Sequence, residues 1–130
     1  MNKQAAFTIA LVDDHALMRK TVHFRLSRMG YEVTMEAENG KQFLEQLEGA
    51  PSPTLCLLDI DMPVMNGFET AVQLKQKWPG IKILFFSMQN SSGYVKKARE
   101  IGADGYICKD ASTEELNKTL FEVLHKPQVA

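Results

Sequence analysis

The strongest constraint on the fold of this 130-residue chain is a regular alternation of two kinds of segment. Short apolar runs that predict buried strands occupy residues 7–12, 32–37, 54–58, 81–86 and 105–108. Helical patterns follow each of them. Because strands that alternate with helices are joined by right-handed crossovers, we expect an α/β fold: a doubly wound, five-stranded parallel sheet with five helices.

The helical segments place apolar residues on one face. In the first, Met18, Val22 and Leu26 recur at steps of four residues. The third begins near Gly67 and is expected to bury Phe68, Ala71 and Val72. The predicted helix ends are marked by Gly30, Pro79-Gly80, Gly102 and Pro127, and the start of the last helix by Ser112, which has capping-box spacing with Glu115.

Composition limits the classes of partner. The formal net charge is -1 and the pI is about 6.3, so this segment has no electrostatic reason to bind nucleic acid or an anionic membrane. We find no apolar stretch long enough to span a bilayer and no signal-peptide pattern near Met1, so we expect a cytoplasmic location. Cys56 and Cys108 lie in apolar runs and are expected to be small buried side chains.

Acidic residues follow two of the predicted strands. Asp13 and Asp14 end the first run, and Asp59 ends the third. In an open parallel sheet these strand ends meet at one edge, where ligands bind. Carboxylates that crowd together repel one another unless a cation joins them, and oxygen ligands of this kind suit Mg²⁺.

Ser87 and Lys109 extend the pattern, because they follow the fourth and fifth runs. Phosphoryl transfer requires neutralisation of charge on three equatorial oxygens, which a metal, a lysine and a hydroxyl can share. Asp59 is then either the nucleophile, forming an acyl phosphate, or a further metal ligand.

These features together resemble the receiver domain of bacterial two-component response regulators over about residues 7–124. The matching segments are 11–15 (LVDDH), 57–67 (LLDIDMPVMNG), Ser87 and 102–109 (GADGYICK). The resemblance implies a flavodoxin-like sheet of order 2-1-3-4-5 in a single domain. Residues 125–130 are then a tail or the start of a linker to an output domain outside this chain.

The resemblance also implies roles. Asp59 accepts a phosphoryl group from a sensor histidine kinase, while Asp13, Asp14, Asp59 and the main-chain carbonyl of Asp61 bind Mg²⁺. Lys109 pairs with the phosphoryl group, and Ser87 and Tyr106 move on phosphorylation. The surface of the fourth helix, fifth strand and fifth helix changes, and it can pair two copies in a homodimer.

His15 after the acid pair, and Lys109-Asp110-Ala111, are similar to regulators that carry a C-terminal helix-turn-helix of the LuxR type. The expected output is therefore control of transcription through a DNA-binding domain outside this chain. A stand-alone phosphorelay protein is the alternative.

The domain is expected to catalyse only its own phosphorylation and dephosphorylation. An aspartyl-phosphate phosphohydrolase is disfavoured. Asp59 and Asp61 resemble the aspartate pair of haloacid-dehalogenase-type phosphatases, but in those enzymes a Thr or Val follows two positions after the second acid, where this chain has Pro63.

Four polar or aromatic residues keep open roles. Asp61 either tunes the lifetime of the phosphoryl group or is a solvated loop acid. Gln89 either orients a hydrolytic water or, the interpretation we favour, is a surface residue. His15 either approaches the rim of the site or, the interpretation we favour, is an ordinary residue at a helix start. Phe121 either joins a partner surface or, the interpretation we favour, is part of a wide core face.

Overall fold

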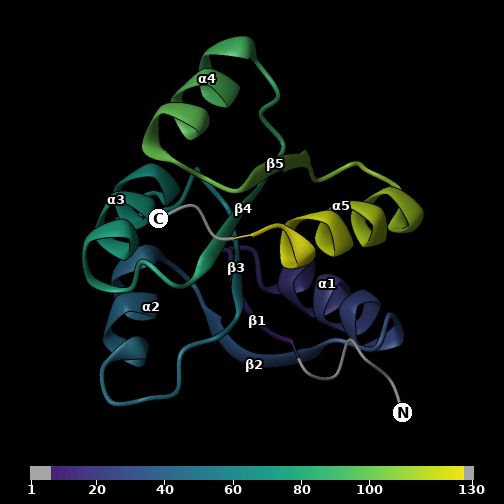
Figure 1. Ribbon diagram of the computed structural model, residues 1–130, viewed down its shortest axis with the longest axis horizontal. Helices are drawn as coiled ribbons and strands as arrows, with labels where there is room; N and C mark the ends of the chain where they lie inside the picture. The colour runs from purple at the N-terminus through teal and green to yellow at the C-terminus, as the bar shows by residue number, and fades with distance from the viewer. Residues whose placement is uncertain (1–6, 128–130) are drawn as a thin grey trace.

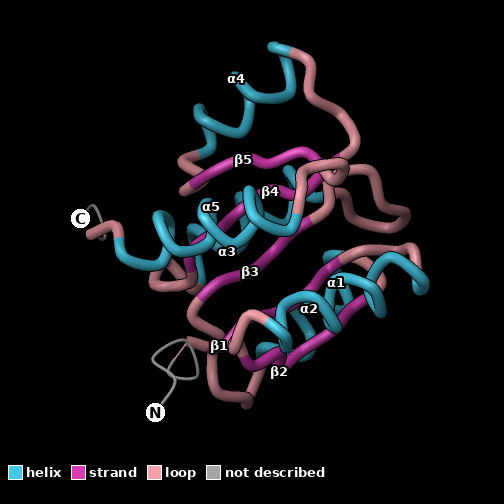
Figure 2. The backbone as a smooth tube through the Cα atoms, turned by 90° about the vertical axis from the view of Figure 1, so that its right-hand side faces the viewer, coloured by secondary structure: helices cyan, strands magenta, loops and turns pink. Residues whose placement is uncertain are grey.

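A five-stranded parallel sheet crosses the molecule, and helices cover both of its faces (Figure 1). The computed structural model describes residues 7–127. The strand order is β2-β1-β3-β4-β5, and Figure 2 shows the strands side by side in that order. The strands are β1 (Thr8–Val12), β2 (Glu32–Ala37), β3 (Leu55–Leu58), β4 (Lys82–Ser87) and β5 (Gly105–Cys108). The predicted fold class and strand order are therefore confirmed.

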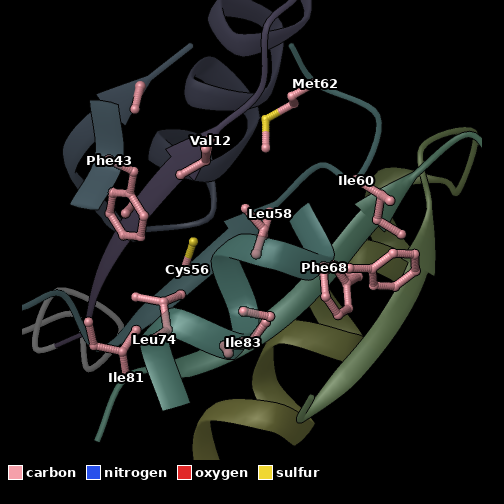
Figure 3. Close-up of a cluster of buried hydrophobic side chains, with 14 of the residues drawn as sticks. Val12, Phe43, Cys56, Leu58, Ile60, Met62, Phe68, Leu74, Ile81 and Ile83 are labelled. Atoms are coloured by element: carbon pink, nitrogen blue, oxygen red, sulfur yellow. The ribbon is translucent and has the colours of Figure 1, made fainter. Parts of the chain in front are cut away.

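Alternate residues of each strand reach opposite faces of the sheet and build two cores. On one face, Ile9 and Leu57 pack with α1 and α5 residues such as Leu26 and Leu120. On the other, residues such as Phe43, Leu58 and Ile83 form the cluster drawn in Figure 3. Every residue of β3 and β4 is buried, which explains why their apolar runs are continuous.

The five helices begin and end close to the predicted residues. They are α1 (Ala16–Arg28), α2 (Gly40–Leu47), α3 (Gly67–Lys77), α4 (Ser92–Ile101) and α5 (Thr113–His125). Gly102 ends α4 in the left-handed conformation, with φ of 97°. Ser112 accepts a hydrogen bond from Glu115 N, as its position predicts. A reciprocal capping box forms at Asn66 and Glu69, at the start of α3.

Two predictions about side chains and one about the bounds of a strand need correction. Val72 is 44% exposed, because the core-facing stripe of α3 runs through Phe68, Ala71 and Leu74 instead. Phe121 is 53% exposed on α5, so the expected wide core face is wrong. The fourth strand is shifted by one residue and includes Ser87, which pairs with Cys108 on β5.

Cys56 is buried as expected, and burial raises the pKa of its thiol, so it is an inert core residue. Cys108 is only half-buried. Among residues 7–127, none of the helices has the length and apolar character that crossing a membrane requires.

Candidate functional site

Two neighbouring strands deliver buried acids to one point. Val12 pairs with Leu58, so the residues that follow, Asp13 and Asp59, lie side by side. Their main chains continue the ladder: Asp59 N donates to Val12 O at 2.9 Å, and Asp13 N donates to Ala37 O at 3.0 Å. Asp13 is 6% exposed and Asp59 is 5% exposed. The sheet therefore holds both carboxylates rigidly, close together and away from bulk water.

Lys109 joins these two acids. Its Nζ lies 2.6 Å from Asp13 Oδ2 and 3.3 Å from Asp59 Oδ2. Lys109 is itself buried, and its main-chain N donates to Ser87 O at 2.9 Å, which fixes the end of β5 against β4. A buried charge is tolerated only with partners, and here one ammonium faces two carboxylates. The site keeps excess negative charge.

Burial is the main influence on the pKa of Asp59, and the neighbouring charges modify it. Burial raises the pKa of Asp59 to about 6; the Lys109 ammonium opposes this shift, and the Asp13 carboxylate adds to it. Asp59 Oδ1 accepts a hydrogen bond from Ile60 N at 2.9 Å, which also favours the ionised form. A carboxylate of this kind is stabilised by any cation that enters the site.

The donor set fits a hard divalent ion. Ligand atoms of Asp13, Asp14, His15 and Asp59 lie within 4.8 Å of one another. Asp14 Oδ1 is buried and accepts no hydrogen bond within the described residues, although His15 Nδ1 lies 3.2 Å from it. An orphaned buried carboxylate oxygen is costly unless a ligand satisfies it. Carboxylate oxygens are the ligands that Mg²⁺ prefers, so these residues fit the predicted metal.

His15 lies at the rim of the acid site, which was the less favoured of its two predicted roles. It is the N-cap residue of α1, but its side chain makes no capping hydrogen bond. Its Nδ1 lies 3.2 Å from Asp13 Oδ1 and 3.2 Å from Asp14 Oδ1, while the ring is largely exposed. His15 is therefore a rim residue of the site as well as a helix-start residue.

The loop after β3 passes tightly beneath α3. Gly67 N donates to Ile60 O at 2.8 Å, and a Cβ atom on Gly67 would lie 2.1 Å from the carbonyl oxygen of Asp59. Only glycine allows this approach. Val64, in the same loop, has φ of 70°, a conformation that is unfavourable for a β-branched residue. The loop geometry is thus set by tertiary contacts rather than by local propensity.

The Asp61 side chain points to a different partner. It is exposed and accepts a hydrogen bond from the Tyr94 hydroxyl of α4 at 3.1 Å, which raises the pKa of Tyr94. The ligand atoms gathered at Asp13, Asp14, His15 and Asp59 do not include its carboxylate. The predicted metal-binding role concerns the main-chain carbonyl of Asp61 and stays a prediction.

Ser87 and Tyr106 meet the same short loop after β4. Ser87 is buried and its Oγ accepts from Gln89 N at 3.0 Å, while the Tyr106 hydroxyl donates to the Gln89 carbonyl. Tyr106 is half-buried beside Phe85, and burial raises its pKa. The Gln89 side chain is exposed, as predicted, but its main chain links the two residues that the resemblance identifies as mobile.

Comparison with known families decides what this arrangement is. Residues 9–121 match the model of the response regulator receiver domain. The chain belongs to this family. The receiver domain is 41% identical over 124 residues to the nitrate/nitrite response regulator protein NarL of Escherichia coli (strain K12), covering 94% of this chain and 56% of NarL. It is 37% identical over 119 residues to the chemotaxis protein CheY of Bacillus subtilis (strain 168), covering 88% of this chain and 98% of CheY.

Solved structures agree. The crystal structure of a DNA-binding response regulator of the LuxR family from Staphylococcus aureus superposes with a TM-score of 0.85 at 27% identity, covering 92% of this chain and 99% of that chain. The predicted family and the similarity to LuxR-type regulators are confirmed. The receiver domain spans about half the length of NarL and other full-length regulators that it matches. Receiver domains are signalling modules of two-component systems rather than conventional enzymes.

Proposed function

We propose that this receiver domain is a phosphorylation switch in which Asp59 accepts a phosphoryl group from a sensor histidine kinase. The observation that carries the proposal is the position of Lys109 Nζ, which contacts both Asp13 and Asp59 at the buried end of the sheet. In phosphoryl transfer most of the catalytic effect comes from positioning and charge neutralisation, and this site offers both. Asp13, Asp14, Asp59 and the Asp61 carbonyl would hold Mg²⁺.

The chemistry follows from the two oxygens of Asp59. One carboxylate oxygen attacks phosphorus, a P–O bond forms, and the P–N bond to the kinase histidine breaks, so the imidazole leaves with the electron pair and takes up a proton. Bound Mg²⁺ would supply charge neutralisation on a phosphoryl oxygen. Lys109 would exchange its contact with Asp13 for one with the phosphoryl group. The Ile60 amide keeps the carboxylate oriented at 2.9 Å.

We infer that Ser87 and Tyr106 carry the change to the surface. Movement of Ser87 toward the phosphoryl group would pull on the loop at Gln89, to which Tyr106 is bonded. Tyr106 would then turn inward, and the surface of α4, β5 and α5 would change its shape. That surface is the proposed contact for a second copy, which would give a homodimer.

The proposed output is control of transcription through a DNA-binding domain joined after residues 125–130, in a cytoplasmic protein. The support is the similarity to NarL, of which this chain covers 56%. The alternative is a stand-alone receiver that acts by protein contact, and its support is CheY, of which the chain covers 98%. The open reading frame around this sequence separates them: a helix-turn-helix encoded after Pro127 favours transcription control.

The phosphoacceptor assignment is tested by intact-mass spectrometry after incubation with Mg²⁺ and a small phosphodonor such as acetyl phosphate. We expect wild type to gain one phosphoryl group, Asp59→Asn to gain none, and chelation of Mg²⁺ to abolish the gain. Equal labelling of Asp59→Asn would reject the assignment. Sustained phosphate release from many phosphate monoesters, without a change of conformation, would favour a phosphohydrolase instead.

A further inference from the structure

Arg19 reaches the acid site from behind, although neither the motifs nor the proposed reaction use it. It lies in the first turn of α1, where its main-chain N donates to His15 O at 3.0 Å. Its guanidinium Nη1 donates to the main-chain carbonyl of Asp13 at 2.6 Å. The Arg19 side chain is only 16% exposed and lines a small cavity shared with Asp13 and Asp59. It is therefore built into the floor of the site.

The accepting carbonyl has a special place in the chain. It belongs to the peptide group that joins Asp13 to Asp14, and a peptide group is a rigid plane. Fixing that plane sets the directions in which the two carboxylates leave the backbone. Asp13 N is bonded to Ala37 O of β2 at 3.0 Å, so Asp13 is held from both sides. The hydrogen bond from Arg19 completes this fixation on the side of Asp14.

Glu36 and His23 hold Arg19 in place. Arg19 Nε lies 3.3 Å from Glu36 Oε1, and Glu36 Oε2 lies 2.6 Å from His23 Nδ1. Glu36 belongs to β2 and pairs with Leu11 of β1, two residues before Asp13. A guanidinium is a planar fork, so bonds at two of its nitrogens fix the whole group. The chain of contacts therefore links α1 and β2 to one peptide group of the site.

An ordinary ion pair does not explain this arrangement. An exposed Arg–Glu pair contributes little to stability, and it needs no buried carbonyl. Here the shorter contact of Arg19 is with the carbonyl, at 2.6 Å, and the contact with Glu36 is longer, at 3.3 Å. A charged donor to a neutral carbonyl gives a strong, directional bond.

We propose that Arg19 is a positioning residue that orients Asp13 and Asp14 for divalent-metal binding. This inference rests on the proposed function of the acid site. Outer residues that orient metal ligands commonly contribute 10- to 100-fold to metal affinity. Charge alone makes the opposite prediction, because removing a cation near three carboxylates strengthens the binding of another cation. The sign of the change therefore separates positioning from simple electrostatics.

The test compares Mg²⁺ binding, measured by titration calorimetry, in four forms of the chain. Arg19→Met removes the donor but keeps the length of the side chain, and we expect Mg²⁺ affinity to fall about 10-fold. Arg19→Lys can donate to the same carbonyl and should recover part of the loss. Lys20→Met makes the same charge change at an exposed neighbouring position and should leave affinity equal or slightly higher.

A kinetic measurement separates orientation from misfolding. In Arg19→Met, the Mg²⁺ concentration that gives half-maximal phosphorylation by acetyl phosphate should rise about 10-fold, with a smaller change in the rate at saturating Mg²⁺. Unchanged or tighter Mg²⁺ binding by Arg19→Met, or an equal loss in Lys20→Met, would overturn the proposal. Wild type that binds no Mg²⁺ and accepts no phosphoryl group would instead overturn the proposed function itself.

Discussion

The central strands of the sheet and its β5 edge differ in how completely they are packed. The acceptor side, made of β1, β3 and β4, buries nearly every residue and holds Asp13 and Asp59. The α4–β5 side is less completely packed, because Ala98 and Ile107 are the only buried residues in these two elements. Segments with few buried contacts open at low free energy cost, whereas a packed core moves as a unit. The proposed phosphoacceptor thus sits on the rigid side, and the α4–β5 part of the surface proposed to change sits on the loose side.

The largest expected difference between the two sides is in the free energy of unfolding lost when an isoleucine on each side is replaced by alanine. Ile83→Ala on β4 removes a fully buried side chain and should lower the free energy of unfolding by about 2–5 kcal/mol. Ile101→Ala on α4 removes a half-buried side chain and gains helix propensity, so we expect about 1 kcal/mol or less. Urea unfolding measures both values. Similar losses at the two positions would contradict the packing contrast.

On the acceptor side, the ionised carboxylate of Asp59 should lower the stability of the folded state at neutral pH. The pKa of Asp59 is raised to about 6, so the folded state binds its proton more tightly than the unfolded chain. The contribution of Asp59 to stability is therefore fully present below about pH 4 and is lost as the pH rises through about 6. Since Asn cannot ionise, Asp59→Asn should be more stable than wild type at pH 7 by about 2–3 kcal/mol, and the difference should vanish in acid.

Urea unfolding in the presence of a chelator, from pH 3.5 to 7.5, measures this difference. Asp61→Asn is the matched control, because it removes an acid two residues away that is exposed to water. We expect no comparable gain from it. A constant difference between Asp59→Asn and wild type across this pH range would show that burial does not destabilise the Asp59 carboxylate.

A smaller effect is expected where β4 meets the end of α5. Lys82 is buried, and its Nζ donates to the carbonyls of Val123 at 2.7 Å, Leu124 at 3.3 Å and Lys126. These carbonyls lie at the C-terminal end of α5, where a helix leaves carbonyls without i+4 partners; the Val123 carbonyl also accepts from Lys126 N at 3.3 Å. Lys82→Met should cost about 1–2 kcal/mol and increase hydrogen exchange in the last turn of α5. Lys77→Met, which breaks an exposed pair with Glu48, is the control and should cost less than about 1 kcal/mol.

The smallest effect tests the one described side-chain hydrogen bond from α4 to the rim of the acid site. Tyr94→Phe removes the hydroxyl that donates to Asp61 and keeps the ring against Phe68. Because this bond is exposed, we expect almost no change in global stability. Hydrogen exchange should nevertheless speed up at the amides of α4 and not at those of β3. Equal acceleration in both elements would show that the loose side does not open by itself.

The fold was largely predictable because its signals are local. Continuous apolar runs and stop signals such as Gly30 and Gly102 predicted the five strands and helices to within a few residues. The errors concerned which side of a helix faces the core rather than where the helices and strands lie. Val72 and Phe121 are apolar but exposed, because the width of a core-facing stripe depends on which neighbours cover it, and the sequence does not state this.

The site was predictable in part for the same reason. Strand-end residues are brought together by topology, so Asp13, Asp59 and Lys109 could be expected to meet. Arg19 was not expected at the site, and His15 was expected there only as the less favoured alternative, because their contacts depend on side-chain directions at the start of α1. The close approach of Gly67, at the start of α3, to the loop after β3 was missed as well, since a glycine at a helix start is ordinarily only a capping signal.

Gly67 shows how such a position would behave in an unbiased survey of substitutions. With only 2.1 Å available between a Cβ atom and the Asp59 carbonyl oxygen, even alanine must displace the backbone that carries Asp59, the proposed phosphoacceptor. In a deep mutational scan that selects for signalling, position 67 should therefore be as intolerant as a reactive residue. Its intolerance would reflect the lack of space for a side chain. A map of essential positions in this chain would therefore include positions needed for backbone geometry as well as those needed for chemistry.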